Sequence, residues 1–522
     1  MAQSFVEITR NVVDRFLQNI LFIDDKAYQP ENKENAFDAR EISSVFAKKG
    51  KLCTIFEPHS PEDLKNGSSL FPKSDVVVLD WYLDLKNEKQ IENAEADADE
   101  EDPRGVHTIG LIKKIVEDAS DKKLKLIIIY TGDGTKLEEI TNKIYDEIKT
   151  YGVYHLIGED CRVSSSNVLI LVRAKSNGEG EQYKHIENLL NKVIKYDDLP
   201  NFITNEFAEF IGGLLPNFAL SAIASIRECT SNVLGVFSKD IDPAFLGDYV
   251  SIPDSNDAVS MLPKIFGTAV INLIETSDVD FDGWIKAWID EKIKDNQITI
   301  GKKSFTVNAD NLKAFVTPNE TFENKLNTIF KANIDVKNLN QVDFYKKEAS
   351  NLFDNGDTKH SNYKWAKLVQ HSNLFSSPKN HKLTAGTIIK KDEDRFLICI
   401  QQRCDSVRIS KEEERSFLFL PLQQNGKGEA VVVEENKHLI VDNKSYSIEL
   451  HKFKPIATDV QILAKPQNDQ YVFTDIENKQ YIWVAELKDM FAQHIVSNYA
   501  SQLSRVGIDN SEWIRLVGKL GK

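Results

Sequence analysis

The sequence predicts an α/β chain in three parts: an N-terminal five-stranded, doubly wound parallel domain, a mainly helical middle region, and a small antiparallel, β barrel-like domain with a terminal helix. Three observations lead to this prediction. Continuous apolar strands alternate with amphipathic helices, helical spacing then continues alone, and short strands with turn residues follow. Apolar strands separated by helices need a sheet covered on both faces. We expect domains at residues 1–198, 199–378 and 379–522.

The N-terminal domain is predicted from its alternating elements. Gly50 ends its second helix and Pro58 stops its second strand. Residues 86–104 carry eight acids against three bases and almost no apolar residues, which indicates a solvated insertion. The expected strands are residues 20–23, 51–57, 76–79, 124–131 and 167–175, and the expected helices are residues 4–19, 38–50, 105–120, 137–152 and 181–196.

In the remaining residues, the spacing of apolar positions changes after Pro378. Before it, apolar residues follow helical spacing, and the small residues of 219–224 would suit either a dimerisation helix or an ordinary core helix. After it, turn signals such as QNGKG separate short apolar runs, which favours a small barrel or curled sheet closed by a helix of about 17 residues and a turn at Gly507. The expected strands are residues 382–391, 395–404, 416–423, 429–435, 437–443, 444–453 and 481–488.

Composition excludes several classes of protein. The chain has 522 residues and a formal net charge of −15, and no basic block stands out, so we expect no nucleic acid partner. No apolar run approaches a membrane span, and the first residues carry charges where a signal peptide needs an apolar centre, so we expect a cytoplasmic protein without a membrane partner. The five cysteines form neither a metal spacing nor a disulfide pattern: Cys53, Cys161, Cys229, Cys399 and Cys404.

Polar residues stand at the carboxyl ends of the predicted parallel strands, where ligands bind in such sheets. Asp24 and Asp25 follow the first strand, Asp80 the third, Thr131 the fourth and Lys175 the fifth. Converging carboxylates repel one another unless a hard cation lies among them, and Mg²⁺ suits few carboxylates with water and phosphate oxygens. A carboxylate can also attack phosphorus, with a lysine and a hydroxyl to bind the transferred group.

This set resembles the receiver domain of bacterial two-component response regulators, which has a flavodoxin-like fold. The matching motifs are FIDDK, VVLDWYLD, IIYTGDG and LVRAKS, within roughly the first 200 residues. The resemblance implies a sensor histidine kinase as partner and Mg²⁺ as cofactor. It implies these roles: Asp80 as phosphoacceptor, Thr131 as switch hydroxyl, Lys175 as the phosphate-pairing lysine, and Asp24, Asp25, Asp80 and the Tyr82 carbonyl as magnesium ligands.

Two positions depart from ordinary receivers. Val172 stands where an aromatic switch residue is usual, and Ser176 stands where proline usually follows the lysine. The spacing from Thr131 to Lys175 is also longer than usual by about one element. These features resemble a divergent group of receiver-bearing proteins from Detocs-type phage-defence systems, which implies an anti-phage role.

Three functions remain open at this point. The first is a response regulator that acts through protein interaction, with a second response regulator, an effector protein or a second copy as partner, or as a phosphate sink. The second is a receiver-gated enzyme with an unidentified active site in residues 200–522, where Cys404 and Asp405 with His371, His381 or His451 are weak candidates. The third, a transcription factor, is disfavoured because no basic recognition helix is present.

Overall fold

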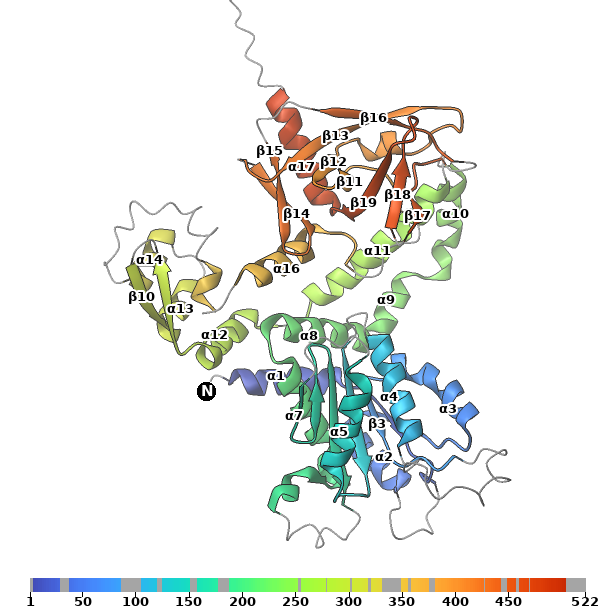
Figure 1. Cartoon of the computed structure of the whole chain (residues 1–522), viewed down its shortest axis with the longest axis vertical. Helices are drawn as coiled ribbons and strands as arrows, with labels where there is room; N and C mark the ends of the chain where they lie inside the picture. The colour runs from blue at the N-terminus through green and yellow to red at the C-terminus, as the bar shows by residue number, and fades with distance from the viewer. Residues whose placement is uncertain are drawn as a thin grey trace, which may run out of the picture. The chain divides into compact units, whose positions relative to one another are not determined.

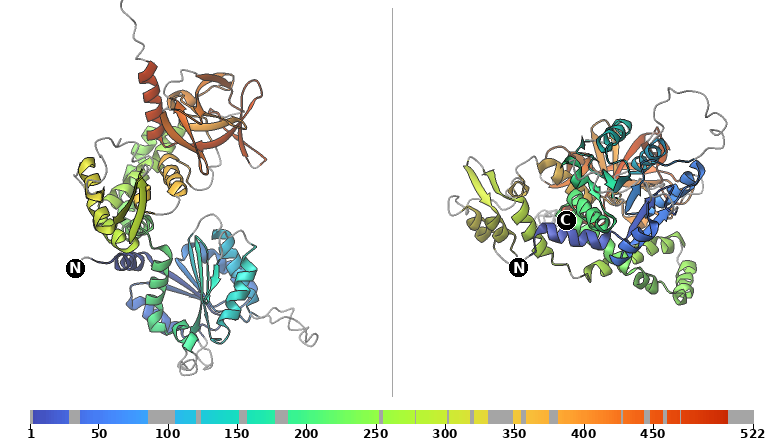
Figure 2. Two further views of the ribbon diagram at one scale, coloured as in Figure 1. Left: turned by 60° about the vertical axis from the view of Figure 1, so that its left-hand side comes forward. Right: turned by 90° about the horizontal axis from the view of Figure 1, so that it is seen from below.

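The computed structural model divides the chain into two compact units, Met1–Lys292 and Ile293–Lys522. The first holds the N-terminal sheet and the second holds the C-terminal sheet (Figures 1 and 2). The predicted insertion at 86–104 and the predicted turn at Gly507 lie outside the described residues. The structure describes residues 3–28, 37–85, 105–119, 124–150, 157–176, 187–251, 255–277, 279–300, 303–317, 321–330, 349–354, 358–374, 381–426, 428–442, 448–456, 460–468 and 470–503.

The five predicted parallel strands are present, in the order β2-β1-β3-β4-β7. Strands β3, β4 and β7 are buried along their whole length, as continuous apolar runs require. The parallel pairing brings their carboxyl ends to one edge of the sheet. The bounds are β1 (Asn19–Ile23), β2 (Leu52–Phe56), β3 (Val76–Leu79), β4 (Lys125–Thr131) and β7 (Val168–Lys175).

Helices cover both faces of this sheet because alternate strand residues point to opposite faces. Ile20 and Phe22 lie in one apolar core, while Leu21 and Ile23 lie in the other. The first core is completed by α1 (Phe5–Phe16), α2 (Ala39–Lys48) and α7 (Leu199–Ile211), and the second by α3 (Pro61–Gly67), α4 (Val106–Ala119) and α5 (Leu137–Ile148). The sheet is therefore doubly wound, as predicted (Figure 1).

Three strands that were not predicted extend the sheet to eight. The antiparallel hairpin of β5 (Ile157–Glu159) and β6 (Arg162–Ser164) pairs through β6 with β7, and β8 (Val193–Ile194) pairs in parallel with the end of β7. Asp160 and Cys161 form the hairpin turn with positive φ angles of 48° and 58°. This hairpin accounts for the extra length between Thr131 and Lys175.

The predicted closing helix at residues 181–196 was wrong over its described part. Residues Glu187–Lys192 form the 3₁₀-helix η2, and β8 follows directly. The two β-branched residues of β8 pair with the carboxyl end of β7 instead of continuing a helix. The helix that covers this part of the sheet is α7, which begins after the 3₁₀-helix η3 (Tyr196–Asp198).

Helix α8 attaches the following helices to the N-terminal sheet. The Arg227 guanidinium donates two hydrogen bonds to the buried Asp75 carboxylate at 2.7 and 3.0 Å and lies over the Phe16 ring. The Asn217 amide donates to Thr9 Oγ1 at 2.8 Å. The elements of this part are η1 (Ser68–Lys73), α8 (Leu214–Glu228), α9 (Thr230–Val236), η4 (Lys239–Ile241), α10 (Asp242–Ser251), α11 (Ser255–Glu275) and α12 (Phe281–Lys292).

One stretch of α11, Ala258–Glu275, is long and apolar enough to cross a membrane by length and composition alone. Core helices of soluble proteins meet the same criterion, so this is weak support for a membrane span. Within the described residues no second stretch meets it.

The second unit begins with a hairpin that was not predicted, β9 (Asp295–Ile300) and β10 (Lys303–Asn308). Its alternation of apolar and polar residues around Gly301 is the signal that could have revealed it. The helices that follow confirm a mainly helical middle region. They are α13 (Ala309–Val316), α14 (Phe322–Phe330), η6 (Ser350–Leu352) and α16 (Thr358–Gln370).

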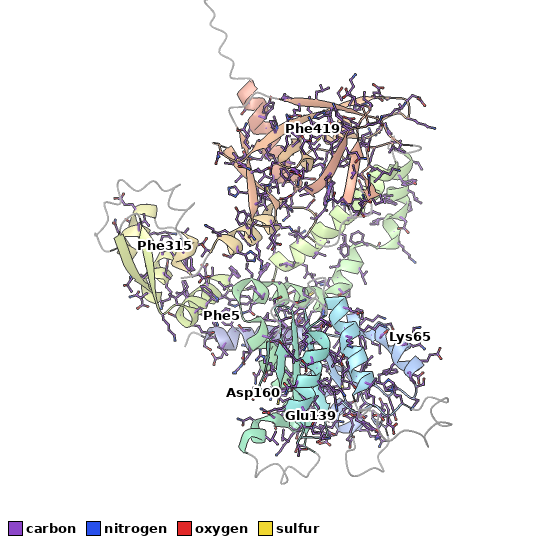
Figure 3. The ribbon with its side chains drawn as sticks, viewed as in Figure 1. Phe5, Lys65, Glu139, Asp160, Phe315 and Phe419 are labelled. Atoms are coloured by element: carbon purple, nitrogen blue, oxygen red, sulfur yellow. The ribbon has the colours of Figure 1, made fainter. Side chains whose placement is uncertain are left out.

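The C-terminal region is an antiparallel sheet of nine strands with a terminal helix. The pairing path from β14 to β17 does not return to its start, so the sheet is curled rather than closed. Phe419 lies buried in one of its two cores (Figure 3). The elements are β11 (Thr387–Asp392), β12 (Arg395–Cys399), η7 (Arg403–Ser406), β13 (Arg415–Gln423), β14 (Gly428–Glu434), β15 (Lys437–Asp442), β16 (Glu449–Phe453), β17 (Lys465–Gln467), β18 (Gln470–Thr474), β19 (Gln480–Glu486) and α17 (Asp489–Leu503).

A buried histidine in this sheet should make its stability depend on pH. His381 is 1% exposed and packs against the Tyr471 and Trp483 rings, and among the described residues neither of its ring nitrogens has a hydrogen-bond partner. Burial lowers the pKa of His381. The unfolded chain therefore takes up a proton near pH 6.5 that the folded chain does not, so this residue makes folding stability fall as the pH drops below about 6.5.

We expect His381→Phe to reduce this acid sensitivity. Thermal unfolding of the full chain between neutral pH and about pH 5.5 would measure the effect. His59→Gln, which changes an exposed histidine of the first unit, is the control and should leave the pH dependence unchanged. An unaltered slope in the His381 variant would contradict the prediction.

Candidate functional site

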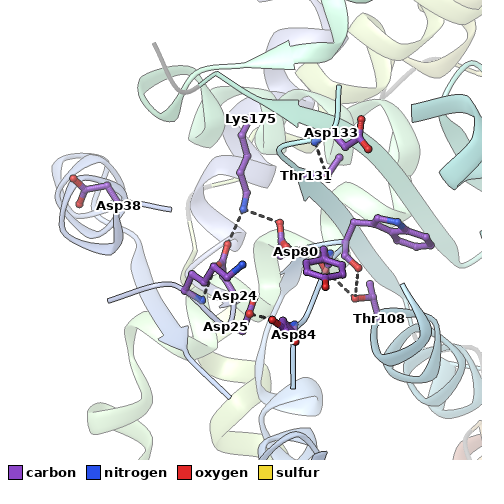
Figure 4. A network of polar contacts seen from close by, with 12 residues as sticks. Asp24, Asp25, Asp38, Asp80, Asp84, Thr108, Thr131, Asp133 and Lys175 are labelled. Carbon is purple, nitrogen blue, oxygen red and sulfur yellow. Dashed lines mark hydrogen bonds and ion pairs between the residues drawn. The ribbon is translucent and has the colours of Figure 1, made fainter. Parts of the chain in front are cut away.

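Polar side chains gather at the carboxyl edge of the parallel sheet. Asp24 and Asp25 directly follow β1, Asp80 follows β3, Thr131 ends β4 and Lys175 ends β7. They line one cavity of about 400 Å³, and Figure 4 shows Lys175 between Asp24 and Asp80. The cavity is lined by Asp24, Asp25, Lys26, Asp80, Trp81, Tyr82, Thr131, Gly132, Asp133, Lys136, Glu139, Ile140, Lys143 and Lys175.

The Lys175 ammonium is the centre of this cluster. Its Nζ donates to Asp24 Oδ2 at 2.7 Å and to Asp80 Oδ1 at 2.7 Å. The three side chains are 4%, 5% and 13% exposed, so solvent screens these ion pairs little. Burial alone would lower the pKa of Lys175, but the Asp80 and Asp24 carboxylates raise it above its ordinary value. The ammonium is therefore charged at every physiological pH.

Opposing effects act on the pKa of the Asp80 carboxyl. Burial raises its pKa to about 6, Lys175 opposes this rise, and Asp24 and Asp25 add to it. The carboxyl group is thus mostly ionised at neutral pH, although burial destabilises its ionised form. The backbone N–H of Asp80 donates to the Ile23 carbonyl at 2.9 Å, and its Oδ2 accepts from the Tyr82 N–H at 3.1 Å. These bonds fix both the main chain and the side chain of Asp80.

The acidic pair after β1 completes the negative charge of the cavity. Burial raises the pKa of Asp25, and its Oδ2 accepts from the Asp84 N–H at 3.2 Å. Asp24 Oδ1 accepts from the Lys26 N–H at 3.0 Å, while its other oxygen binds Lys175. The cavity thus holds three buried or nearly buried carboxylates, and two of them, Asp24 and Asp80, bind the Lys175 ammonium. The excess negative charge suits a hard divalent cation.

Two threonines shape the site from different elements. Thr131 is 3% exposed, and its Oγ1 accepts from the Asp133 N–H at 3.2 Å, so the hydroxyl hydrogen is available to a group in the cavity. Thr108 of α4 is fully buried, and its Oγ1 donates to the Asp80 carbonyl at 2.9 Å and lies 3.1 Å from the Trp81 carbonyl. Thr108 was not predicted, because a threonine in a helix carries no sequence signal for a contact 28 residues away.

Comparison with known families assigns this part of the chain. The family model described as the response receiver domain matches residues 16–180. These residues are a receiver domain. No curated protein and no solved structure matches the chain. The match covers the site and its sheet, so the predicted resemblance to receivers is confirmed, and it supports a response-regulator-like phosphoacceptor role.

Receiver domains generally bind Mg²⁺ at the phosphorylation site, and the donor set here fits such an ion. Carboxylate and carbonyl oxygens are its preferred protein ligands. Among the described residues, no group of three or more His, Cys, Asp or Glu side chains is arranged to hold a metal ion. The magnesium site of Asp24, Asp25, Asp80 and the Tyr82 carbonyl therefore stays a prediction. Asp25 is buried beside the charge of Asp24, and Asp80 beside the charges of Asp24 and Asp25, and this arrangement favours a cation.

The departure at Val172 has a structural counterpart. Val172 is fully buried in the core beneath α5, and its N–H donates to the Cys161 carbonyl of the β5–β6 hairpin at 2.9 Å. In a sheet with the strand order 2-1-3-4-5, β7 would be the last strand. Here the outer edge of β7 is paired with β6. An aromatic side chain at position 172 would have to pack in this filled core.

Thr108 should position the backbone that carries Asp80. Thr108→Val keeps the shape of the side chain and leaves the Asp80 carbonyl without its donor, so we expect about 1 kcal/mol lower stability. A small displacement of the nucleophile should slow phosphoryl acceptance by about tenfold or more. Thr108→Ser, which keeps the hydroxyl, is the matched control. The rate of modification from acetyl phosphate measures the effect, and equal rates for valine and wild type would refute it.

The weak enzyme candidates of the second unit do not form a site. Cys404 is exposed, and its Sγ contacts Gln402 Oε1 at 3.7 Å. His371 Nε2 bonds the Val432 carbonyl at 2.7 Å, and His451 bonds Glu449 and Tyr481 at 3.0 Å each. With His381 packed between aromatic rings, each histidine has a structural role within the described residues. No base for Cys404 is found there.

Proposed function

We propose that this chain is a response regulator that accepts a phosphoryl group on Asp80 from a partner histidine kinase. The observation that carries the proposal is the Lys175 ammonium held at 2.7 Å from both Asp80 and Asp24 at the carboxyl edge of a receiver sheet. A fixed cation beside a strand-end carboxylate provides charge stabilisation for a transferred phosphoryl group.

In the proposed reaction, an Asp80 oxygen attacks the phosphorus of a phosphohistidine. The new O–P bond forms as the P–N bond breaks, and the imidazole nitrogen leaves with the electron pair and takes up a proton. Lys175 pairs with the phosphoryl oxygens, and the Thr131 hydroxyl donates a hydrogen bond to one of them. Asp24, Asp25, Asp80 and the Tyr82 carbonyl would hold Mg²⁺, which neutralises charge on the phosphoryl oxygens when bound.

The output we propose is protein interaction or the withdrawal of phosphoryl groups from a competing receiver. The partner would be a second response regulator, an effector protein or a second copy of this chain. The departures at Val172 and Ser176 and the extra hairpin support a place in the divergent, Detocs-like group, and hence a cytoplasmic anti-phage pathway. In this proposal residues 1–198 receive the signal, and residues 199–378 and 379–522 transmit it.

Incubation of the full chain with acetyl phosphate tests the proposal. Intact mass should show the addition of one phosphoryl group when Mg²⁺ is present. Treatment with hydroxylamine should remove it, because an acyl phosphate is labile to this nucleophile and a phosphoserine or phosphothreonine is not. Without a divalent cation the rate should fall strongly. An unmodified chain under all these conditions would overturn the proposal.

A further inference from the structure

An aromatic cluster links the proposed phosphoryl site to the start of α7. The Phe37 ring lies 5.5 Å from Lys175 Nζ, in cation–π geometry. The Phe37 and Tyr196 ring centroids are 6.4 Å apart, and those of Tyr196 and Tyr130 are 6.2 Å apart. Tyr130 is the residue before Thr131. The cluster therefore contacts Lys175 through Phe37 and includes the residue directly before Thr131.

Hydrogen bonds tie the same cluster to the segment that enters α7. The Tyr130 hydroxyl donates to the Ile194 carbonyl of β8 at 2.6 Å, and β8 pairs with the Ala174 and Lys175 backbone. The Tyr196 hydroxyl accepts from the Asp38 N–H, with a long distance of 3.3 Å. Tyr196 belongs to η3, and α7 begins three residues later.

The cluster also combines fixed and movable members. Tyr130 is 1% exposed and Phe37 is 4% exposed, so both are held by the core. Tyr196 is only half-buried, and its hydroxyl accepts the long hydrogen bond from the Asp38 N–H. Of the three rings it can change position at the lowest cost, and it lies directly before a helix that packs on the sheet.

We infer that Tyr196 transmits a change in the position of the Lys175 ammonium to α7. The inference rests on the proposed function. The Lys175 ammonium now lies 2.7 Å from both Asp80 and Asp24 and 5.5 Å from the Phe37 ring, and a phosphoryl group on Asp80 adds negative charge that draws it toward the new phosphoryl oxygens. The altered contact shifts Phe37 against Tyr196 and changes how η3 and the first turn of α7 are held. This pathway takes the place of an aromatic switch at position 172, which Val172 cannot provide.

Hydrogen exchange of the full chain tests this inference. Amides of residues 199–205 are followed by mass spectrometry with and without acetyl phosphate and Mg²⁺, and modification of Asp80 is measured in the same samples. We expect a severalfold change in their exchange rate on modification of the wild type. In Tyr196→Leu, which removes the ring and the hydroxyl, Asp80 should still be modified but the change should be lost.

Tyr145→Leu is the matched control. Tyr145 is a partly buried tyrosine of α5 on the opposite face of the same sheet, and this variant should keep the exchange response of α7. Modification of Asp80 without any response of α7 in the wild type overturns the inference alone, as does a full response in Tyr196→Leu. An unmodified wild type instead overturns the proposed function and the inference with it.

Discussion

Asp80→Asn will carry no phosphoryl group after incubation with acetyl phosphate and Mg²⁺. An amide oxygen is too weak a nucleophile for phosphorus, so this substitution removes the proposed acceptor. The loss of modification should therefore be complete rather than partial. Intact mass of the full chain measures it directly.

Asp133→Asn is the control for this variant. Asp133 lines the same cavity, and its N–H bonds Thr131, but it does not follow a parallel strand directly. We expect this variant to accept a phosphoryl group as the wild type does. Equal modification of Asp80→Asn and wild type would place the acceptor elsewhere and disprove the role of Asp80.

Lys175→Met should have the second large effect, on stability as well as on phosphoryl acceptance. Removal of the ammonium leaves the Asp24 and Asp80 carboxylates buried without their shared partner. Breaking a buried ion pair in this way costs about 3–5 kcal/mol. We also expect phosphoryl acceptance to fall by about a hundredfold or more, because a fixed charge beside the reacting group is lost.

The stability loss in this variant should depend on pH. Lys175 now opposes the rise in the pKa of Asp80, so its removal raises that pKa above about 6. The folded variant then takes up a proton at a higher pH than the unfolded chain, and stability is regained as the pH falls toward 5. Denaturant unfolding at several pH values would show a deficit that is larger at pH 8 than at pH 5.

Lys136→Met is the control for Lys175. Lys136 lines the same cavity, but its side chain is 38% exposed and lies 3.9 Å from Asp133. An exposed pair of this kind contributes at most about 1 kcal/mol. Similar stability losses in the two variants would show that Lys175 is not the buried counter-charge of the site.

The candidate site was predictable because it follows from strand order. Buried parallel strands are mostly apolar runs, and polar residues at or directly after their carboxyl ends could be read from the chain: Asp24, Asp80, Thr131 and Lys175. Parallel pairing places such ends at one edge. The structure confirms that these side chains meet in one cavity, while their chemical roles stay predictions.

The missed strand β17 lacks such a pattern. The hairpin of β17 and β18 turns at Asn468, with a positive φ of 48°, and β17 is exposed along its length, so it has no apolar signal. The helix expected at 181–196 was wrong over residues 187–194, because pairing with the end of β7 outweighs local helical spacing there.

The sequence by itself determined the doubly wound receiver sheet and the side chains at its carboxyl edge, because the burial of apolar strands and helices leaves a periodic pattern. Only the tertiary structure decided that Thr108 holds the Asp80 backbone and that Phe37 and Tyr196 connect Lys175 to α7. These contacts join residues far apart in the chain. They depend on packing distances and hydrogen-bond geometry, which no local periodicity records.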